Sequence, residues 1–270
     1  MKKCFWILCV LFCPLFHLFA VNNLRIVDIR SMGAGGNGAT LSPLYNPALI
    51  ALCPKKSVRI NYFNRYALKE LGACNGSLYL PNPTLSLGID ISAFGYDAYR
   101  EDLFRLLLAK RLGQKWTLGI SFQYAFVQTE LYEEKSSRLS TDVGMVYSPV
   151  NNVLIALLIM NMPSVQMGDK SLEIKDFEAY LLQMGFNWEV INNILITCTL
   201  GSSNEQTVAF AAGVEYQPFE DFSIRAGIQG KPFLPSFGIG YRFSVFTIDV
   251  ATVFHPILGV SSGVGFQLSF

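Results

Sequence analysis

Charged side chains recur at alternate positions within otherwise apolar segments of this 270-residue chain. In such a setting a carboxylate or guanidinium can pair with an opposite charge on a neighbouring segment, or it can contact a polar ligand. Four of these residues lie on successive segments close to short turns, which predicts a ladder of ion pairs, with a polar gate or ligand contact as the alternative. The full set is Arg59, Asp90, Arg105, Asp142, Glu215, Arg225, Arg242 and Asp249, and the ladder comprises the last four.

No combination of residue types predicts catalysis. His255 stands alone in a loop and His17 lies in the N-terminal leader, with no serine elbow or cysteine–histidine pair beside them. Gly33, Gly35 and Gly38 satisfy G-x-G-x-x-G, but a dinucleotide site also needs a following helix, a second parallel strand and an acidic residue about 20 positions on. Alternating segments follow instead. We therefore expect a compact glycine-rich loop that packs closely against another element, and neither an enzyme nor a cofactor.

Three cysteines remain after the first twenty residues, namely Cys53, Cys74 and Cys198. An odd number precludes a complete disulfide framework, and their scatter, without a CxxC motif or a nearby histidine, argues against a metal site. We expect them to be small apolar fillers, and the sequence leaves one disulfide bridge open.

Residues 1–20 have the pattern of a secretory signal peptide, because Lys2 and Lys3 precede a long apolar run that ends at Ala20. An N-terminal membrane anchor is the alternative. Without those two lysines, 19 of the 21 basic residues remain against 20 acidic ones. A nearly neutral chain gives no reason to expect a nucleic-acid partner.

The composition is apolar, with 51% hydrophobic and 15% charged residues, whereas soluble domains carry about 25% charged residues. Beyond the leader, no apolar run reaches the roughly 18 to 20 residues that a membrane helix needs, and the longest is Val153 to Met160. Apolar residues spread over short alternating runs predict a β-barrel rather than a bundle of helices.

The last thirteen residues, 258–270, show this alternation most clearly. One face carries Leu258, Phe266 and Phe270, and the other is glycine, serine and glutamine. We count fourteen such segments, an even number, and most are near the roughly 9 to 11 residues that cross a bilayer at a tilt. They span 57–66, 73–81, 84–95, 103–111, 115–128, 137–148, 152–162, 174–188, 191–200, 206–217, 221–230, 235–244, 245–255 and 258–270.

An open sheet edge cannot satisfy its backbone groups in hydrocarbon, so we expect residues 57–66 to pair with residues 258–270. Connections after even-numbered segments are short, and those after odd-numbered ones tend to be longer, the longest being 162–173. Tyr147, Trp188 and Tyr216 precede short turns, which indicates an aromatic girdle at a membrane interface. In the last five segments the polar face is mostly small residues, which predicts a narrow bore that something else fills.

Two motifs resemble those of a known family. The run 32–36 (Met-Gly-Ala-Gly-Gly) followed by 45–49 (Tyr-Asn-Pro-Ala-Leu) resembles the N-terminal plug of the FadL superfamily of outer-membrane channels, and residues 224–256 resemble its PorV/PorQ-like branch. The resemblance implies an all-β fold, a closed antiparallel transmembrane barrel of about fourteen strands at 57–270 with a plug at 21–56 inside it. The implied site residues are Gly33, Gly35, Gly36, Gly38, Asn46, Pro47 and Ala48 in the plug, and Gly265, Leu268 and Phe270 in the family's C-terminal assembly signal.

The same resemblance implies a bacterial outer-membrane location with both termini in the periplasm. The implied partners are outer-membrane lipid and the barrel-assembly machinery, together with a hydrophobic, fatty-acid-like ligand or components of a secretion system. Two functions therefore remain open. The first is a channel for hydrophobic small molecules, and the second is a PorV/PorQ-like docking barrel of the type IX secretion route, which the short outer connections favour.

Overall fold

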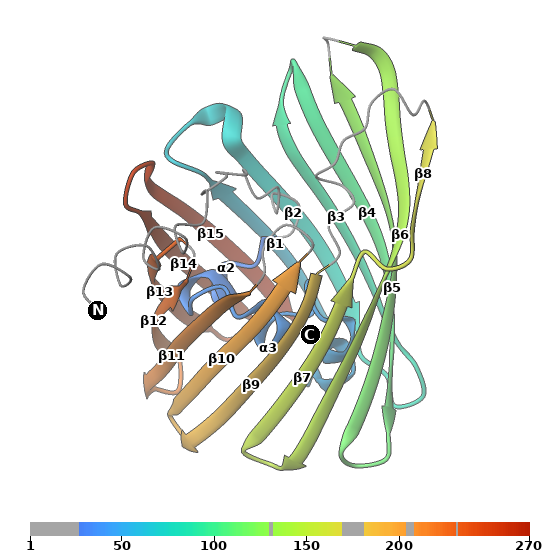
Figure 1. Cartoon of the computed structure of the whole chain (residues 1–270). Coiled ribbons are helices and arrows are strands. Elements are labelled where there is room, and N and C mark those ends of the chain that lie inside the picture. The colour runs from blue at the N-terminus through green and yellow to red at the C-terminus, as the bar shows by residue number, and fades with distance from the viewer. Residues whose placement is uncertain (1–26, 130–131, 169–180, 204–207, 231) are drawn as a thin grey trace, which may run out of the picture.

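The computed structural model describes residues 27–129, 132–168, 181–203, 208–230 and 232–270. Its strands form one antiparallel sheet that closes on itself (Figure 1). The predicted closed barrel is therefore confirmed. The strands are β1 (Ser57–Asn64), β2 (Gly72–Leu80), β3 (Ser86–Tyr96), β4 (Tyr99–Leu112), β5 (Trp116–Thr129), β6 (Tyr132–Val150), β7 (Val153–Met160), β8 (Ser164–Gly168), β9 (Leu181–Ile191), β10 (Ile194–Ser203), β11 (Ala209–Phe219), β12 (Phe222–Gln229), β13 (Leu234–Phe243), β14 (Phe246–His255) and β15 (Gly259–Ser269).

The first and last strands close the barrel. In the β1–β15 ladder, Ser57 lies opposite Ser269 and Asn64 lies opposite Ser262, and the β5–β6 ladder joins the remaining edges. The predicted pairing of residues 57–66 with 258–270 is confirmed. Large apolar side chains of these strands point outward, as the 53% exposure of Ile60 and the 52% exposure of Phe266 show.

β7 and β8 both pair with β6 and together occupy one strand position of the wall, so the fifteen strands form a fourteen-strand barrel. β6 pairs with β7 near the short turns and with β8 farther along. The break lies at residues 161–163, where Asn161 has a φ of 60° and Pro163 has no N–H to donate to a ladder. The prediction that 162–173 is the longest loop is wrong in its first half, because β8 continues the wall there.

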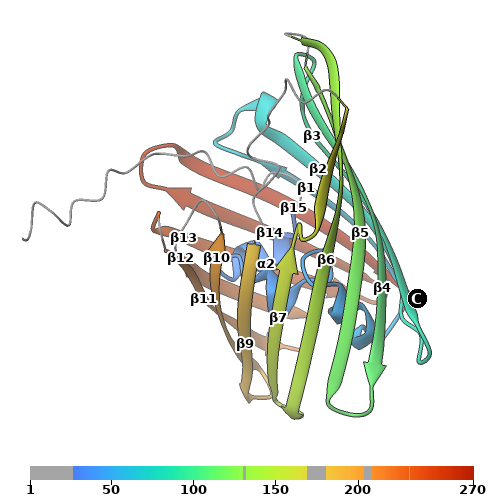
Figure 2. The same cartoon turned by 45° about the vertical axis from the view of Figure 1, so that its right-hand side comes forward.

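The wall is also taller than expected on one side. The predicted strands 103–111 and 137–148 start earlier, at Tyr99 and Tyr132, and Tyr96 pairs with Tyr99 across a tight hairpin. The expected long connection after the third strand is therefore wrong, and Figure 2 shows β3 to β6 rising above their neighbours. The predicted leader, 1–20, and residues 174–180 of the predicted strand 174–188 lie outside the described residues.

Residues 27–56, which we call the plug, lie inside the barrel (Figures 1 and 2). They form α2 (Ile29–Gly33), α3 (Gly38–Leu41) and the 3₁₀ helix η1 (Pro47–Leu52), and a further 3₁₀ turn, η2 (Lys69–Leu71), follows β1. α2 packs on β1 and on β12 to β15, α3 on β7, β9 and β10, and η1 on β3 to β6. The plug thus touches nearly the whole circumference of the bore. The segment is helical in part, and not the loop that the sequence predicted, because caps at Asp28 and Asn46 start helical turns.

The three cysteines are free, so the disulfide bridge that the sequence left open is not formed. Within the described ranges, no helix is long and apolar enough to cross a membrane.

Candidate functional site

The plug enters the bore through a capped turn. The Oδ1 atom of Asp28 accepts a hydrogen bond from Ser31 N at 2.8 Å, and Ser31 Oγ donates to Asp28 O at 3.0 Å, which starts α2. After α2 the chain reverses at Gly35 and Gly36, whose φ angles of 81° and 76° favour glycine. Gly36 N donates to Ser31 O at 2.7 Å. The glycine run therefore builds a tight turn that ends a helix.

The Asn-Pro-Ala triplet is a second cap. Asn46 Oδ1 accepts from Ala48 N at 3.1 Å, and its Nδ2 donates to Ala39 O at 2.9 Å. Pro47 occupies the first position of η1, where a missing N–H costs nothing. One buried side chain thus starts η1 and ties it back to α3, which explains why an asparagine followed by a proline is needed here.

Glycines of the wall make room for the plug backbone. A Cβ atom at Gly213 would lie 2.2 Å from Ala34 O, and one at Gly227 would lie 2.2 Å from Gly35 N. These two wall glycines face each other across β11 and β12. Further wall glycines lie against the backbone or side chains of the plug, among them Gly238 at Gly33, Gly119 at Ala48, Gly144 at Asn46, Gly185 at Thr40, Gly88 at Ile50 and Gly263 at Ile29. The small residues that the sequence placed on the inner face therefore form the surface on which the plug packs.

A buried ionic cluster centred on Arg105 fixes one side of the plug. Arg105 Nη2 lies 2.7 Å from Asp142 Oδ2, and its Nη1 lies 3.6 Å from Asp90 Oδ2. The same guanidinium donates to the plug carbonyl of Leu44. Asp142 in turn accepts from Asn161 N at 2.9 Å. The cluster therefore joins the plug to the break between β7 and β8.

A second cluster holds α2. Arg30 of the plug donates through Nε and Nη2 to both oxygens of Glu215, each at 3.0 Å. Arg225 donates to Glu215 at 2.7 Å and to Asp249 at 2.5 Å. Two guanidinium groups balance two carboxylates, and the negative charge of Glu215 raises the pKa of Arg30.

A third contact ties the beginning of α2 to β1. Arg59 Nη1 lies 3.4 Å from Asp28 Oδ2, and its guanidinium carbon lies 5.5 Å from the centroid of the Tyr79 ring. Deeper in the plug, burial raises the pKa of Tyr45 to about 12, so this phenol is neutral at physiological pH.

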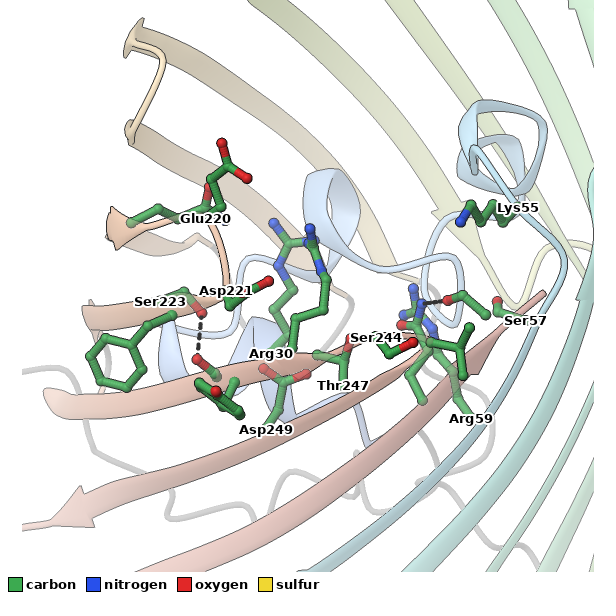
Figure 3. Close-up of a pocket in the computed structure, with 18 of the residues that line it drawn as sticks. Arg30, Lys55, Ser57, Arg59, Glu220, Asp221, Ser223, Ser244, Thr247 and Asp249 are labelled. Carbon is green, nitrogen blue, oxygen red and sulfur yellow. Dashed lines mark hydrogen bonds between the residues drawn. The ribbon is translucent and has the colours of Figure 1, made fainter.

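A polar cavity of about 330 Å³ lies between the plug and the short turns. Figure 3 shows Arg30, Lys55, Arg59 and Asp249 around it, with Glu220 and Asp221 contributed by the β11–β12 turn. Arg30 reaches it from α2 while still bound to Glu215, and its side chain stays 37% exposed. One anchor of the plug is therefore open to solvent on this side.

Both ends of the bore carry apolar and polar side chains. Near the long connections, Phe63, Phe94, Leu103 and Val127 belong to buried apolar clusters, and the polar side chains of Glu101, Gln123 and Arg138 are buried on β4, β5 and β6. Near the short turns, the polar cavity is accompanied by a buried apolar cluster that includes Tyr79 and Leu107. The plug lies between the two ends.

The structure brings the predicted inward charges into three groups. Asp90, Arg105 and Asp142 form the first cluster, Glu215, Arg225 and Asp249 the second, and Arg59 pairs with Asp28. Arg242 departs from the predicted ladder. It lines the cavity, is exposed and forms no ion pair in the described part of the chain. The reason is its place at the end of β13, two residues before the turn at Ser244 that leads into β14.

Sequence reasoning missed the charged residues of the plug itself. Asp28 and Arg30 supply the plug side of two ion pairs, and no alternation marks them because they lie in a helical segment. The wall alone gave no signal, because two of the four predicted ladder residues are acidic and two are basic. Only the structure shows that Arg242 is at the rim, which leaves one carboxylate to pair with Arg30 of the plug.

The predicted assembly-signal residues lie on β15 and at its end. Gly265 faces inward, where an added Cβ would lie 2.6 Å from Asn61 Oδ1, and Phe270 is exposed while its N–H donates to Lys56 O at 2.9 Å. Among the residues that the structure describes, no group of three or more His, Cys, Asp and Glu side chains is arranged to hold a metal ion.

Together, these features define a closed outer-membrane-type barrel of fourteen strands whose bore is crossed by an internal plug. The sequence matches no family model and no curated protein sequence.

Solved structures share the fold. The toluene transporter TbuX of Ralstonia pickettii superposes with a TM-score of 0.64 at 12% identity, covering 92% of this chain and 99% of that one. The toluene transporter TodX of Pseudomonas putida gives 0.62 at 11% identity over 89% and 97%. A FadL homologue of Pseudomonas aeruginosa gives 0.57 at 12% identity over 91% and 98%. The chain thus has the fold of FadL-type barrels.

Proposed function

We propose that this protein is an outer-membrane channel that binds and passes hydrophobic small molecules. The observation that carries the proposal is the plug, which lies inside the bore against the apolar clusters of Phe63, Phe94 and Leu103 on one side and the polar cavity on the other. An apolar molecule gains free energy by leaving water for such clusters, at about 25 cal/mol per Å² of apolar surface. The fold shared with hydrocarbon transporters supports the same proposal.

Passage requires the plug to shift, because its helices pack on nearly all the strands. The contacts that resist this shift are unequal. Leu44 is held by a fully buried arginine, whereas the side chain of Arg30 is 37% exposed at the edge of the polar cavity and its partner Glu215 is 4% exposed. Access of solvent to one partner weakens an ion pair by screening. The α2 end is therefore the part of the plug that moves first.

We further propose that the short turns and both ends of the chain face the periplasm, with the long connections outside the cell. The short turns of bacterial barrels lie on that side, and the alternation of connection lengths places β1 and β15 so that they begin and end there. Cysteines introduced at Gln114 and Ala98 test this orientation. A membrane-impermeant maleimide added to intact cells should label Ala98→Cys and spare Gln114→Cys, and the reverse labelling would overturn the orientation.

Uptake tests the transport proposal. Cells that express the chain should accumulate a dilute fluorescent fatty acid and a neutral alkylbenzene faster than cells that carry an empty vector, while uptake of a small sugar stays unchanged because the plug occupies the bore. Equal uptake of every solute by the two strains would refute the proposal. Deletion of residues 46–48 should change the hydrophobic uptake, since η1 then loses its cap.

The resemblance of residues 224–256 to the PorV/PorQ branch supports a narrower proposal, that the chain belongs to that branch and binds secretion components. Crosslinking in intact cells tests it, because a docking barrel should recover a secretion component or cargo. If crosslinking recovers no secretion component or cargo while the cells take up hydrophobic solutes, the channel remains the supported function.

A further inference from the structure

A lysine lies on the outer wall of the barrel, amid leucines. Side chains of β4 alternate between buried inward positions such as Leu107 and Ala109 and outward positions. By this alternation Lys110 points outward, and it is exposed. It lies opposite Leu118 of β5. A charge on the lipid-facing side of a barrel is costly unless it reaches the polar headgroups.

The surroundings of Lys110 suit acyl chains. Its outward neighbours on β4 are Leu108 and Leu112, and Leu112 is 46% exposed. Leu118 on β5 is 40% exposed, and Leu85 and Leu87 on the β3 side are 44% and 41% exposed. A lysine side chain can lay its apolar stem along such a surface and extend its ammonium toward water.

An aromatic pair marks the height of the membrane interface beside this lysine. Trp116 lies opposite Leu112 in the β4–β5 ladder, and its ring stacks on Tyr147 with centroids 4.3 Å apart. Tryptophan and tyrosine rings settle at headgroup depth. Lys110 is only two residues, about 7 Å, from Leu112 at the end of β4. Because Leu112 lies opposite Trp116, the ammonium of Lys110 reaches the depth of that indole ring.

The rim around this hairpin is positively charged. Lys115 lies in the β4–β5 turn and is exposed, as is Arg111 at the mouth of the bore. The turns on either side, residues 81–85 and 150–152, carry no charge, and the acidic rim residues Glu189, Glu220 and Asp221 belong to the β9–β10 and β11–β12 hairpins. No carboxylate therefore competes for Lys110 and Lys115 among the described residues of these three turns.

We propose that Lys110 and Lys115, with Trp116 and the surrounding leucines, form a binding site for the phosphate headgroup of an anionic glycerophospholipid. The two ammonium groups pair with the headgroup, the indole lies beside its glycerol region, and the leucines contact its acyl chains. The site belongs to the leaflet beside the short turns. It rests on the proposed membrane location but not on transport.

Tryptophan fluorescence tests the site, because the rim offers a matched control. Trp188, 42% exposed, lies three residues before the end of β9 and is followed by Glu189. The third tryptophan, Trp6, precedes the expected cleavage point. The mature chain is placed in nanodiscs that contain either dibrominated phosphatidylglycerol or dibrominated phosphatidylcholine at a fixed small fraction. Trp188→Phe reports on Trp116, and Trp116→Phe reports on Trp188.

Anionic brominated lipid should quench Trp116 more strongly than neutral brominated lipid, since each basic side chain near a membrane favours anionic lipid by about fivefold. Trp188 should show no such preference. Lys110→Gln with Lys115→Gln should abolish the preference at Trp116, as should high salt on the unsubstituted chain, while Lys69→Gln at the opposite end of the barrel should preserve it.

Equal quenching of Trp116 by the two lipids, or a preference that survives the double substitution, would overturn the site while leaving the membrane location intact. Absence of quenching at both tryptophans by both lipids would overturn the membrane location itself. The two failures are therefore distinguishable.

Discussion

Replacing one wall glycine by valine should displace the plug. A Cβ at Gly213 would lie 2.2 Å from Ala34 O, whereas ordinary contacts between heavy atoms are about 3.5 Å. The plug carbonyl must therefore retreat by about 1 Å. The wall cannot retreat instead, because Gly213 is held in ladders with both β10 and β12. Overpacking of this kind costs about 1 to 3 kcal/mol, and the cost falls on the contact between plug and wall.

Gly76→Val is the matched control. Gly76 also lies in a strand, and a Cβ there meets nothing within 4 Å, so this variant gains the same strand propensity without the collision. In planar bilayers Gly213→Val should show more frequent openings than the unsubstituted chain, and limited proteolysis should cut residues 27–56 faster. The temperature at which the barrel loses its heat-modifiable migration should stay close to that of Gly76→Val. If both variants conduct and resist protease like the unsubstituted chain, the contact between Gly213 and Ala34 does not position the plug.

Three further substitutions test the anchors. Arg105→Leu leaves Asp90 and Asp142 buried without their cation, so the free energy of unfolding should fall by about 3 to 5 kcal/mol in a urea titration of the folded barrel, and a loss below 1 kcal/mol would contradict the cluster's role. Asn46→Ala removes the η1 cap and should cost about 0.5 to 2 kcal/mol, measured in the same titration and seen as faster proteolysis of the plug rather than of the strands. Burial raises the pKa of the Cys53 thiol, so its thiolate fraction at pH 8 is smaller than that of a free thiol. In a Cys74→Ser/Cys198→Ser background, maleimide labelling of Cys53 should be slower in the folded than in the urea-unfolded chain, and the labelling rate of the folded chain should continue to rise at more alkaline pH. Identical pH profiles for the two states would contradict the burial.

The barrel was readable from the sequence because lipid imposes a strict alternation. Outward positions such as Ile60 and Phe266 must be apolar, and the inward ones must be small where the plug passes. Closure between residues 57–66 and 258–270 then follows from the cost of unpaired backbone in hydrocarbon. These constraints act on every strand, so a single chain carries the pattern many times.

Local breaks in the strands were harder to predict from the sequence. Residues 162–173 looked like a loop because Pro163 ends the ladder of β7, yet the chain resumes pairing with β6 one residue later. The break is stabilised from elsewhere, by Asp142, which accepts a hydrogen bond from Asn161 N. A contact between residues so far apart in sequence leaves no periodic trace.

The site was half predictable. Alternation placed Glu215, Arg225 and Asp249 inside the barrel, but the charges that complete their clusters come from the plug. Arg30 and Asp28 lie in a short helix whose spacing carries no alternation, and their partners depend on how the plug enters the bore. The glycine-rich motif indicated close packing, but only the structure shows that Gly213 and Gly227 receive Ala34 and Gly35.

A reversible lock between plug and wall tests the central claim most directly. A Cβ at Gly33 would lie 3.5 Å from the Cβ of Ala251, within the range that a disulfide bridge requires. It would also come 2.9 Å from Gly238 Cα, which a small shift of α2 relieves. The substitutions Gly33→Cys and Ala251→Cys are made in a background in which Cys53, Cys74 and Cys198 are replaced by serine, with each single cysteine as a control. If a moving plug opens the bore to hydrophobic molecules, uptake of a fluorescent fatty acid should stop when the double variant is oxidised and return when it is reduced. Equal uptake in the oxidised and reduced states, with the disulfide verified, would contradict the account.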